Sequence, residues 1–189
     1  MKPFTCKNYA QALAEQLANM NWQDVESLAE KLKELISNGK SLYICGNGGS
    51  AGNAQHLAND FLYGVSPKRA KALRVEALSA NASVITCLGN DIGYEHIFSR
   101  QLKVKADVGD MLLVLTGSGN SVNIIQAINV AKKLGVYTAG VLGYSGGQAK
   151  KILDLPLHFD INDMQISEDL QLVVGHMLMR ILCDETQGN

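Results

Sequence analysis

The segment Ser41–Asp60 is the part of this sequence that most restricts the possible folds. It reads SLYICGNGGSAGNAQHLAND, and Ser41–Cys45 is an apolar run typical of a buried β-strand. The glycine-rich stretch Gly46–Ser50 can turn sharply and let the backbone approach a ligand, and Ala51–Asp60 favours a helix. This order places free backbone amides and the positive end of a helix dipole at the turn. The sequence therefore predicts a site for an anion such as phosphate.

Two nucleotide-binding motifs also use a glycine turn after a strand. Gly46, Gly48 and Ala51 match the G-x-G-x-x-G/A pattern of dinucleotide-binding folds. That fold also needs an acidic residue about 20 residues further on, at the end of the next strand. The next strand candidate, Leu73–Ser79, has its only acid, Glu76, in the middle, and no Walker-type Gly-Lys-Ser/Thr follows the glycines. The turn indicates either a phosphate on a smaller molecule or a glycine-rich turn that serves packing alone.

Composition restricts the class of protein. A chain of 189 residues with 47% hydrophobic residues can bury one core but is short for two domains. Its 17 basic and 18 acidic residues include no basic block suited to nucleic acid, and no apolar stretch resembles a signal peptide or a membrane span. The four cysteines lack a C-x-x-C spacing and are interpreted as free thiols. We expect one soluble cytoplasmic domain over 1–189, with a helical lead-in over 1–40 and a core over 41–189, that binds neither nucleic acid nor membrane.

The hydrophobic patterns alternate between helix and strand along the chain. Continuous apolar runs predict strands, and apolar residues at helical spacing predict helices. The predicted strands are 41–45, 73–79, 110–115, 137–144 and 155–161, and the predicted helices are 7–20, 24–37, 51–60, 81–91, 122–134 and 164–184. This order predicts an α/β fold with a doubly wound, largely parallel five-stranded sheet, helices on both faces and two leading helices.

A second polar turn follows the strand predicted at 110–115. It reads TGSGNS and offers the hydroxyls of Thr116, Ser118 and Ser121 to phosphate oxygens, directly before a helix. Two such turns from parallel strands open at the same edge of a sheet. Ligands of doubly wound sheets bind at that edge, where the strand order reverses.

His56 and Asp60 lie four residues apart and share one face of the predicted helix. An imidazole and a carboxylate presented together can be half of a divalent-metal site or an acid/base couple. The same spacing on an exposed helix is often a surface ion pair. Their position just behind the predicted phosphate turn favours the functional interpretation.

Four motifs together resemble the sugar isomerase (SIS) domain: GNGGSAGNAQH at 46–56, GND at 89–91, SGNS at 118–121 and the ED…GH helix at 168–176. Within it the chain most resembles the phosphoheptose isomerases, which interconvert sedoheptulose 7-phosphate and glycero-manno-heptose 7-phosphate. The resemblance runs over essentially the whole chain. It implies an aldose–ketose isomerase of heptose biosynthesis, which supplies precursors of lipopolysaccharide or capsule.

The resemblance also implies roles for individual residues. His56, Asp60, Glu168 and His176 match the metal ligands of the zinc-binding members, which implies one zinc ion per active site. Asp60 and Glu168 would also contact the substrate. The remaining implied substrate and phosphate contacts are Asn47, Gly48, Gly49, Ser50, Asn90, Asp91, Thr116, Gly117, Ser118 and Ser121.

The chemistry of the implied reaction suits these residue types. Aldose–ketose isomerisation moves a proton between two carbons through an enediol, which needs a base, an acid and a positive group beside the oxygen. We assign Asp60 and His176 as the proton carriers, with zinc, where bound, polarising the carbonyl. Glu168 near the start of a helix could instead be a favourable contact with the helix dipole.

The chain departs from the family pattern at three positions. Asp60 and Glu168 stand where the family usually has Glu and Gln, and Gly117 replaces the middle residue of the usual Ser-Thr-Ser. Phosphate binding should survive the loss of one hydroxyl. The two changes at acidic positions leave the identity of the sugar open.

Two non-catalytic alternatives remain for a SIS domain. One is an adaptor similar to the protein that associates with the bacterial replication initiator, and the other is a regulator that senses a sugar phosphate. Both histidines and their neighbouring acids favour an enzyme over the adaptor. A regulator of this kind usually carries a DNA-binding module, for which this chain has no room.

The spacing of Glu168 and His176 suggests an assembly of several subunits. Eight residues of a straight helix separate them by roughly 12 Å and turn them roughly 80° apart, so one zinc ion cannot easily bind both. We therefore expect a homo-oligomer, a tetramer, with active sites that combine residues of two subunits. An apolar stripe on the first helix would be buried between subunits or, more simply, pack on its own domain. It comprises Ala10, Leu13, Leu17 and Met20.

Overall fold

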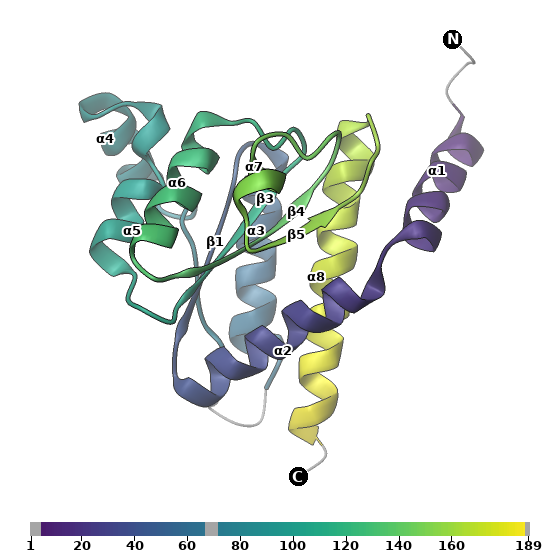
Figure 1. Cartoon of the computed structure of the whole chain (residues 1–189), viewed down its shortest axis with the longest axis horizontal. Coiled ribbons are helices and arrows are strands. Elements are labelled where there is room, and N and C mark those ends of the chain that lie inside the picture. Colours follow the sequence, from purple (N-terminus) through teal and green to yellow (C-terminus); the bar gives the residue numbers. More distant parts are fainter. Residues whose placement is uncertain (1–4, 67–71, 188–189) are drawn as a thin grey trace.

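Five parallel strands form the centre of the computed structural model, which describes residues 5–66 and 72–187. The sheet has the order β2-β1-β3-β4-β5. Its order reverses between β1 and β3, which places a switch point between the two predicted turns. The predicted parallel, doubly wound sheet is confirmed (Figure 1). The strands are β1 (Ser41–Gly46), β2 (Arg74–Ala77), β3 (Met111–Thr116), β4 (Tyr137–Leu142) and β5 (Leu155–His158).

The helices connect the strands and begin where the sequence signals a cap. Thr5 accepts a hydrogen bond from the amide of Asn8, Asn81 accepts one from that of Val84, and Gly39 ends the second helix in the left-handed conformation. The described helices are α1 (Cys6–Asn19), α2 (Trp22–Asn38), α3 (Gly49–Asn59), the π-helix η1 (Asp60–Gly64), α4 (Ala82–Asp91), the 3₁₀-helix η2 (Tyr94–His96), α5 (Ser99–Lys105), α6 (Val122–Lys133), α7 (Ala149–Ile152) and α8 (Met164–Gln187).

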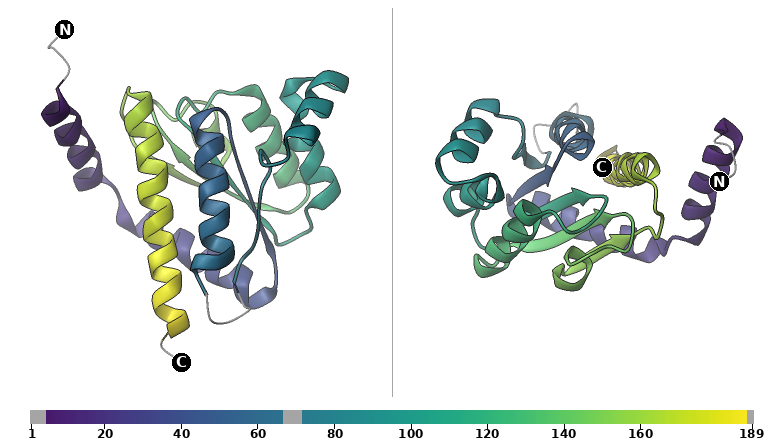
Figure 2. Two further views of the ribbon diagram at one scale, coloured as in Figure 1. Left: turned by 180° about the vertical axis from the view of Figure 1, so that it is seen from behind. Right: turned by 90° about the horizontal axis from the view of Figure 1, so that it is seen from above.

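Apolar cores cover both faces of the sheet. Side chains of α2, α3 and α8 form one core cluster with the strands, and those of α5, α6 and α7 form the other. Figure 2 shows α3 and α8 side by side on one face. The strands read as continuous apolar runs because both faces are buried, and every residue of β3 is buried.

Three short elements were not predicted from the sequence. These are η2, α5 and α7, whose 3 to 7 residues are too short for a clear helical period. The GND tripeptide, at the end of the helix predicted over 81–91, forms the last turn of α4. The predicted helix at 51–60 continues as a π-helix over η1.

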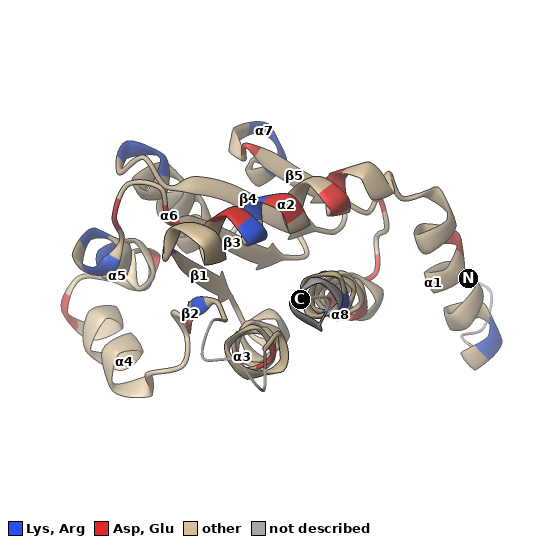
Figure 3. Cartoon of the chain, turned by 90° about the horizontal axis from the view of Figure 1, so that it is seen from below, with Lys and Arg blue, Asp and Glu red and all other residues tan. Residues whose placement is uncertain are grey.

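Helix α1 extends beyond the sheet and its covering helices (Figure 1), but Leu13 and Leu17 pack partly buried against the first core cluster. It has no fully buried residue, and it is tied to α8 by the hydroxyl of Tyr9, which donates to Asp169 Oδ2 at 2.6 Å. Across the described residues, no helix is both long and apolar enough to cross a membrane. Figure 3 shows acidic and basic segments scattered over the described helices rather than collected on one face.

Candidate active site

The two polar turns meet in one cavity at the carboxyl edge of the sheet. β1 leads into α3 and β3 leads into α6, and both helices begin at this cavity of about 280 Å³. The first amides of each helix have no intrahelical partner, so two positive helix ends face the same space. The cavity can therefore bind an anion such as a phosphate group.

We call the cavity at the start of α3 and α6 the phosphate cavity. Glycine and hydroxyl residues shape it. Gly48 has a φ of 57°, which favours glycine, where the chain turns into α3. Thr116 Oγ1 accepts a hydrogen bond from the amide of Gly119 at 3.2 Å, and Ser118 Oγ accepts one from the amide of Asn120 at 3.3 Å. Both hydroxyl hydrogens remain available to a ligand. Ser121 makes no side-chain capping bond to α6, so its hydroxyl is also available.

Nine of the residues implied by the family resemblance line the phosphate cavity. Glu168 reaches it from α8, and a Cβ placed on Gly49 would overlap the Glu168 carboxylate. Met164 and Leu115 complete the lining. The nine are Asn47, Gly48, Gly49, Ser50, Thr116, Gly117, Ser118, Ser121 and Glu168.

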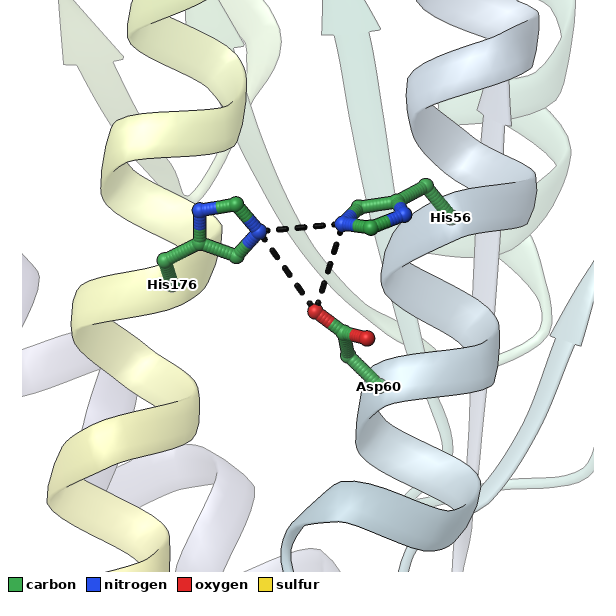
Figure 4. A group of neighbouring side chains, drawn as sticks. All are labelled: His56, Asp60 and His176. Carbon is green, nitrogen blue, oxygen red and sulfur yellow. Dashed lines mark hydrogen bonds and ion pairs between the residues drawn. The ribbon is translucent and has the colours of Figure 1, made fainter.

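A second group of polar side chains lies between α3 and α8 (Figure 4). His56 Nε2 and His176 Nε2 are 3.0 Å apart, and Asp60 Oδ2 lies 3.4 Å from the first and 3.5 Å from the second. Both histidine side chains are half exposed, whereas Asp60 is 17% exposed. We call these three residues the His–Asp–His cluster.

The cluster has the donor atoms and spacing of a metal site. Tetrahedral ligands about 2 Å from a zinc ion lie about 3.3 Å from one another, close to the three observed separations. Two imidazole nitrogens and a carboxylate oxygen form a donor set that zinc accepts. Asn59 Nδ2 lies 3.5 Å from Asp60 Oδ1, while Oδ2 points at the histidines. His56, Asp60 and His176 therefore fit a divalent metal such as zinc.

Helix geometry sets the distance between the phosphate cavity and the His–Asp–His cluster. Ser50 and His56 both lie on α3, six residues apart, which corresponds to about 9 Å along the axis. Between them, Asn53 Nδ2 donates to the Glu168 carbonyl at 3.0 Å and to Gln171 Oε1 at 2.9 Å. Gln171 Nε2 in turn donates to Ser50 Oγ at 3.0 Å. These bonds join α3 to α8 between the two sites.

Glu168 is not part of the cluster, although the family resemblance implied four ligands. It lines the phosphate cavity instead, two turns of α8 before His176. The sequence argument that one zinc ion cannot bind both residues agrees with this arrangement. Asp60 and His176 meet within a single chain, so the His–Asp–His cluster does not need the second subunit that the sequence analysis expected at the active site.

Asn90 and Asp91 line neither the phosphate cavity nor the neighbouring cavity described below. They are exposed at the end of α4, where Asn90 Nδ2 donates to Asp91 Oδ1 at 2.8 Å. The thiol of Cys87 donates to the other Asp91 oxygen at 3.4 Å, and this contact raises the pKa of Cys87. Within one chain, the side chains of Asn90 and Asp91 thus bond to each other, and Asp91 also bonds to Cys87 on the same helix.

A second cavity adjoins the first and involves residues that the sequence analysis missed. Val122 and Asn123 follow directly after the serine-rich turn, so the predicted helix start could have indicated them. Tyr94 and Glu95 carry no local signal, because only the fold brings them to the first turn. Met164, which lines the phosphate cavity, was likewise not singled out.

Comparisons with known proteins all indicate the same family. The family model described as SIS domain matches residues 7–143. The probable phosphoheptose isomerase of Thermoplasma acidophilum is 37% identical over 176 residues, which cover 93% of this chain and 96% of that protein. The phosphoheptose isomerase of Trichlorobacter lovleyi is 42% identical over 160 residues, covering 85% of this chain and 79% of the relative.

Solved structures agree with the sequence relatives. Phosphoheptose isomerase from Neisseria gonorrhoeae superimposes with a TM-score of 0.86 at 25% identity, covering 93% of this chain and 95% of that one. The enzyme from Francisella tularensis gives 0.85 at 27% identity, covering 93% and 92%. This protein therefore belongs to the SIS-domain family and, within it, to the phosphoheptose isomerases.

Proposed function

We propose that this protein is an aldose–ketose isomerase that converts sedoheptulose 7-phosphate into glycero-manno-heptose 7-phosphate through an enediol. The observation that carries the proposal is an anion cavity at the start of α3 and a His–Asp–His cluster near its end, between α3 and α8. The names of the relatives support the same reaction class. All of the relatives reported above are named isomerases, so the adaptor alternative is not favoured.

The separation of the two sites suits a seven-carbon substrate. With C–C bonds of about 1.5 Å, an extended seven-carbon chain measures about 8 Å. The cavity end of α3 lies about 9 Å from His56 along the helix. A phosphate on carbon 7 can therefore occupy the cavity while carbons 1 and 2 reach the cluster.

In this proposal, the polar turns bind the phosphate. The amides at the start of α3 and α6 donate to its oxygens, as do the hydroxyls of Thr116, Ser118 and Ser121. The Glu168 carboxylate beside Gly49 lies at the same cavity, and its negative charge repels the phosphate. Glu168 thus restricts where the phosphate can sit within the cavity.

The His–Asp–His cluster supplies the chemistry at the other end. In this proposal His56, Asp60 and His176 would hold a zinc ion, which would polarise the substrate carbonyl. Asp60 Oδ1 faces away from the histidines and can take up and return the proton that moves between carbons 1 and 2. Because His176 Nε2 would face the metal, a proton transfer by His176 at the substrate oxygen would use its other ring nitrogen, Nδ1.

The activity is tested with purified protein and sedoheptulose 7-phosphate in D₂O. We expect deuterium to enter the aldose product at carbon 2, detected by NMR, and a lower rate with fructose 6-phosphate, whose shorter chain cannot span both sites. If no deuterium enters either sugar, the proposed isomerase activity is wrong. Equal rates on both sugars would refute the length argument alone.

The metal is tested by removal and replacement. Dialysis against a chelator should abolish turnover, and one equivalent of zinc per chain should restore it. The variant His56→Gln should retain far less zinc by elemental analysis, whereas His96→Gln, outside the cluster, should retain all of it. Full activity in protein shown to be free of metal would contradict the zinc assignment.

We also propose that the enzyme is a homotetramer. The apolar side chains of α1, a helix of 14 residues, are only partly buried against their own chain, so a second copy of the chain could cover the rest. Leu62, Tyr63 and Met177 are exposed apolar residues near the cluster and can extend the same contact. Sedimentation at assay concentration tests this assignment, and a fully active monomer would refute it.

We further propose that the enzyme works in the cytoplasm and supplies heptose for lipopolysaccharide or capsule. No disulfide links the four cysteines in the described part of the chain, as suits a reducing compartment. Deletion of the gene should remove heptose from the cell surface. Cell fractionation that finds the protein outside the cytoplasm would contradict the compartment.

A further inference from the structure

The second cavity, of about 570 Å³, shares a wall with the phosphate cavity. Asn47 and Ser121 line both, so these two residues stand between them. The other four lining residues have no role in the function proposed above. They are Tyr94, Glu95, Val122 and Asn123.

Two of these residues hold the side chain of Asn47. The hydroxyl of Tyr94 donates to Asn47 Oδ1 at 3.0 Å, and Asn123 Nδ2 donates to the same oxygen at 2.8 Å. Asn47 Nδ2 returns a hydrogen bond to Asn123 Oδ1 at 2.9 Å. Asn123 is 2% exposed, and a buried amide is costly to leave unpaired, so this pair is firmly held.

The pair of amides by itself does not decide which edge of Asn47 faces which cavity. Turning both carboxamides over exchanges donors and acceptors but keeps two hydrogen bonds. The Tyr94 hydroxyl favours the arrangement in which Oδ1 faces it, because a phenol is a stronger hydrogen-bond donor than acceptor. Gly93, with a φ of 96°, turns the chain after α4 and directs Tyr94 to this point.

One donor of Asn47 remains unused in this arrangement. Nδ2 carries two hydrogens, and only one is bonded, to Asn123; the other makes no hydrogen bond to any residue that the structure describes. With Oδ1 on the Tyr94 side, the carboxamide offers a donor to the ligand. Turned over, it would offer an oxygen, which repels the acceptor oxygens of a phosphate group.

We propose that Tyr94 and Asn123 are positioning residues that orient Asn47 so that its free N–H donates to an oxygen of the bound sugar phosphate. This inference rests on the proposed function, because it takes a sugar phosphate as the ligand. It assigns a purpose to the turn after the GND motif, which brings Tyr94 to the active site.

The test is the variant Tyr94→Phe, which keeps the ring and removes the hydroxyl. We expect KM for sedoheptulose 7-phosphate to rise about three- to tenfold, the effect of one hydrogen bond, with kcat within twofold. Tyr137→Phe is the matched control, because Tyr137 is the first residue of β4 and lies at the amino ends of the strands, away from the cavities. The KM of this variant should be unchanged.

A double-mutant cycle shows whether Tyr94 acts through Asn47. Asn47→Ala should raise KM, and adding Tyr94→Phe to it should change KM by less than 1.5-fold, because the hydroxyl then has nothing to orient. If the two substitutions instead raise KM by independent factors that multiply in the double variant, Tyr94 merely packs in the site. An unchanged KM in Tyr94→Phe would also overturn the proposal.

Calorimetric binding of sedoheptulose 7-phosphate separates this inference from the proposed activity. If the wild-type protein binds the sugar phosphate without isomerising it, the proposed reaction fails, and a three- to tenfold weaker binding by Tyr94→Phe still supports the positioning role. If the wild-type protein isomerises it and Tyr94→Phe binds equally well, the positioning role fails alone. Far-ultraviolet circular dichroism should show that each variant is folded.

Discussion

Gly175 of α8 lies directly against the side chain of Leu57 on α3. A Cβ added at Gly175 would overlap the terminal carbons of Leu57, so only glycine allows the two helices to approach this closely. Leu57 and His56 are neighbours, as are Gly175 and His176. The same close approach brings the two imidazoles to a ring-centroid distance of 5.2 Å.

The first prediction concerns this contact. Gly175→Ala should push α8 away from α3 at a clash cost of about 1–3 kcal/mol, partly offset by the better helix propensity of alanine. Zinc affinity should fall because His176 moves away from His56. Gly52→Ala is the matched control: no atom lies near its Cβ, and this exposed glycine of α3 should gain about 0.5–1 kcal/mol on replacement. Urea unfolding and zinc titration measure both effects, and unaltered zinc affinity in Gly175→Ala would contradict the role of the contact.

The second prediction concerns the phosphate turn. Replacing Ser118 and Ser121 with Ala should raise KM, since each lost hydrogen bond to a charged group is worth about 1.5–3 kcal/mol. The control replaces Ser27 and Ser37, which donate only to carbonyls of α2. Steady-state kinetics should separate the pairs. An unchanged KM in the first pair would remove this turn from the binding site.

The third prediction concerns proton transfer. His176→Gln should lower kcat by about 10²–10⁴-fold, because an amide can fill the space but cannot carry a proton at neutral pH. The melting temperature should change little, since the His176 side chain is 50% exposed. Turnover near the wild-type rate would make His176 a packing residue.

The fourth prediction concerns the glycine that departs from the family pattern. A Cβ at Gly117 would lie 2.8 Å from Met164 Sδ and 3.5 Å from Tyr144 Cε2, so Met164 fills the space of the missing side chain. Gly117→Thr should therefore cost about 1 kcal/mol, and adding Met164→Ala should recover most of it. The cost of Gly119→Ala should not change when Met164→Ala is added. A Cβ at residue 119 would meet the Gly146 backbone instead, and residue 119 has a φ of 66°. Thermal unfolding of the four variants gives the comparison, and an equal response of both glycines would disprove the specific contact.

The sequence by itself determined the fold class and the phosphate cavity. The strands β1 and β3 are continuous apolar runs, and each polar turn lies directly between its strand and its helix. Both features depend on neighbouring residues and on the general rule that parallel strands place such turns at one edge. Asn47 and Ser118 could therefore be placed at one cavity before the structure was known.

Only the tertiary structure decided which candidates share a site. His176 is 120 positions from His56, and helical periodicity gives the face of a helix but not the helix packed against it. Helix geometry alone separates Glu168 from His176, but only the packing of α8 shows that Glu168 lines the phosphate cavity and that His176 belongs to the cluster. Tyr94 reaches Asn47 only because Gly93 turns the chain there. Contacts between distant segments depend on how side chains fill the space between elements, and local patterns do not encode that packing.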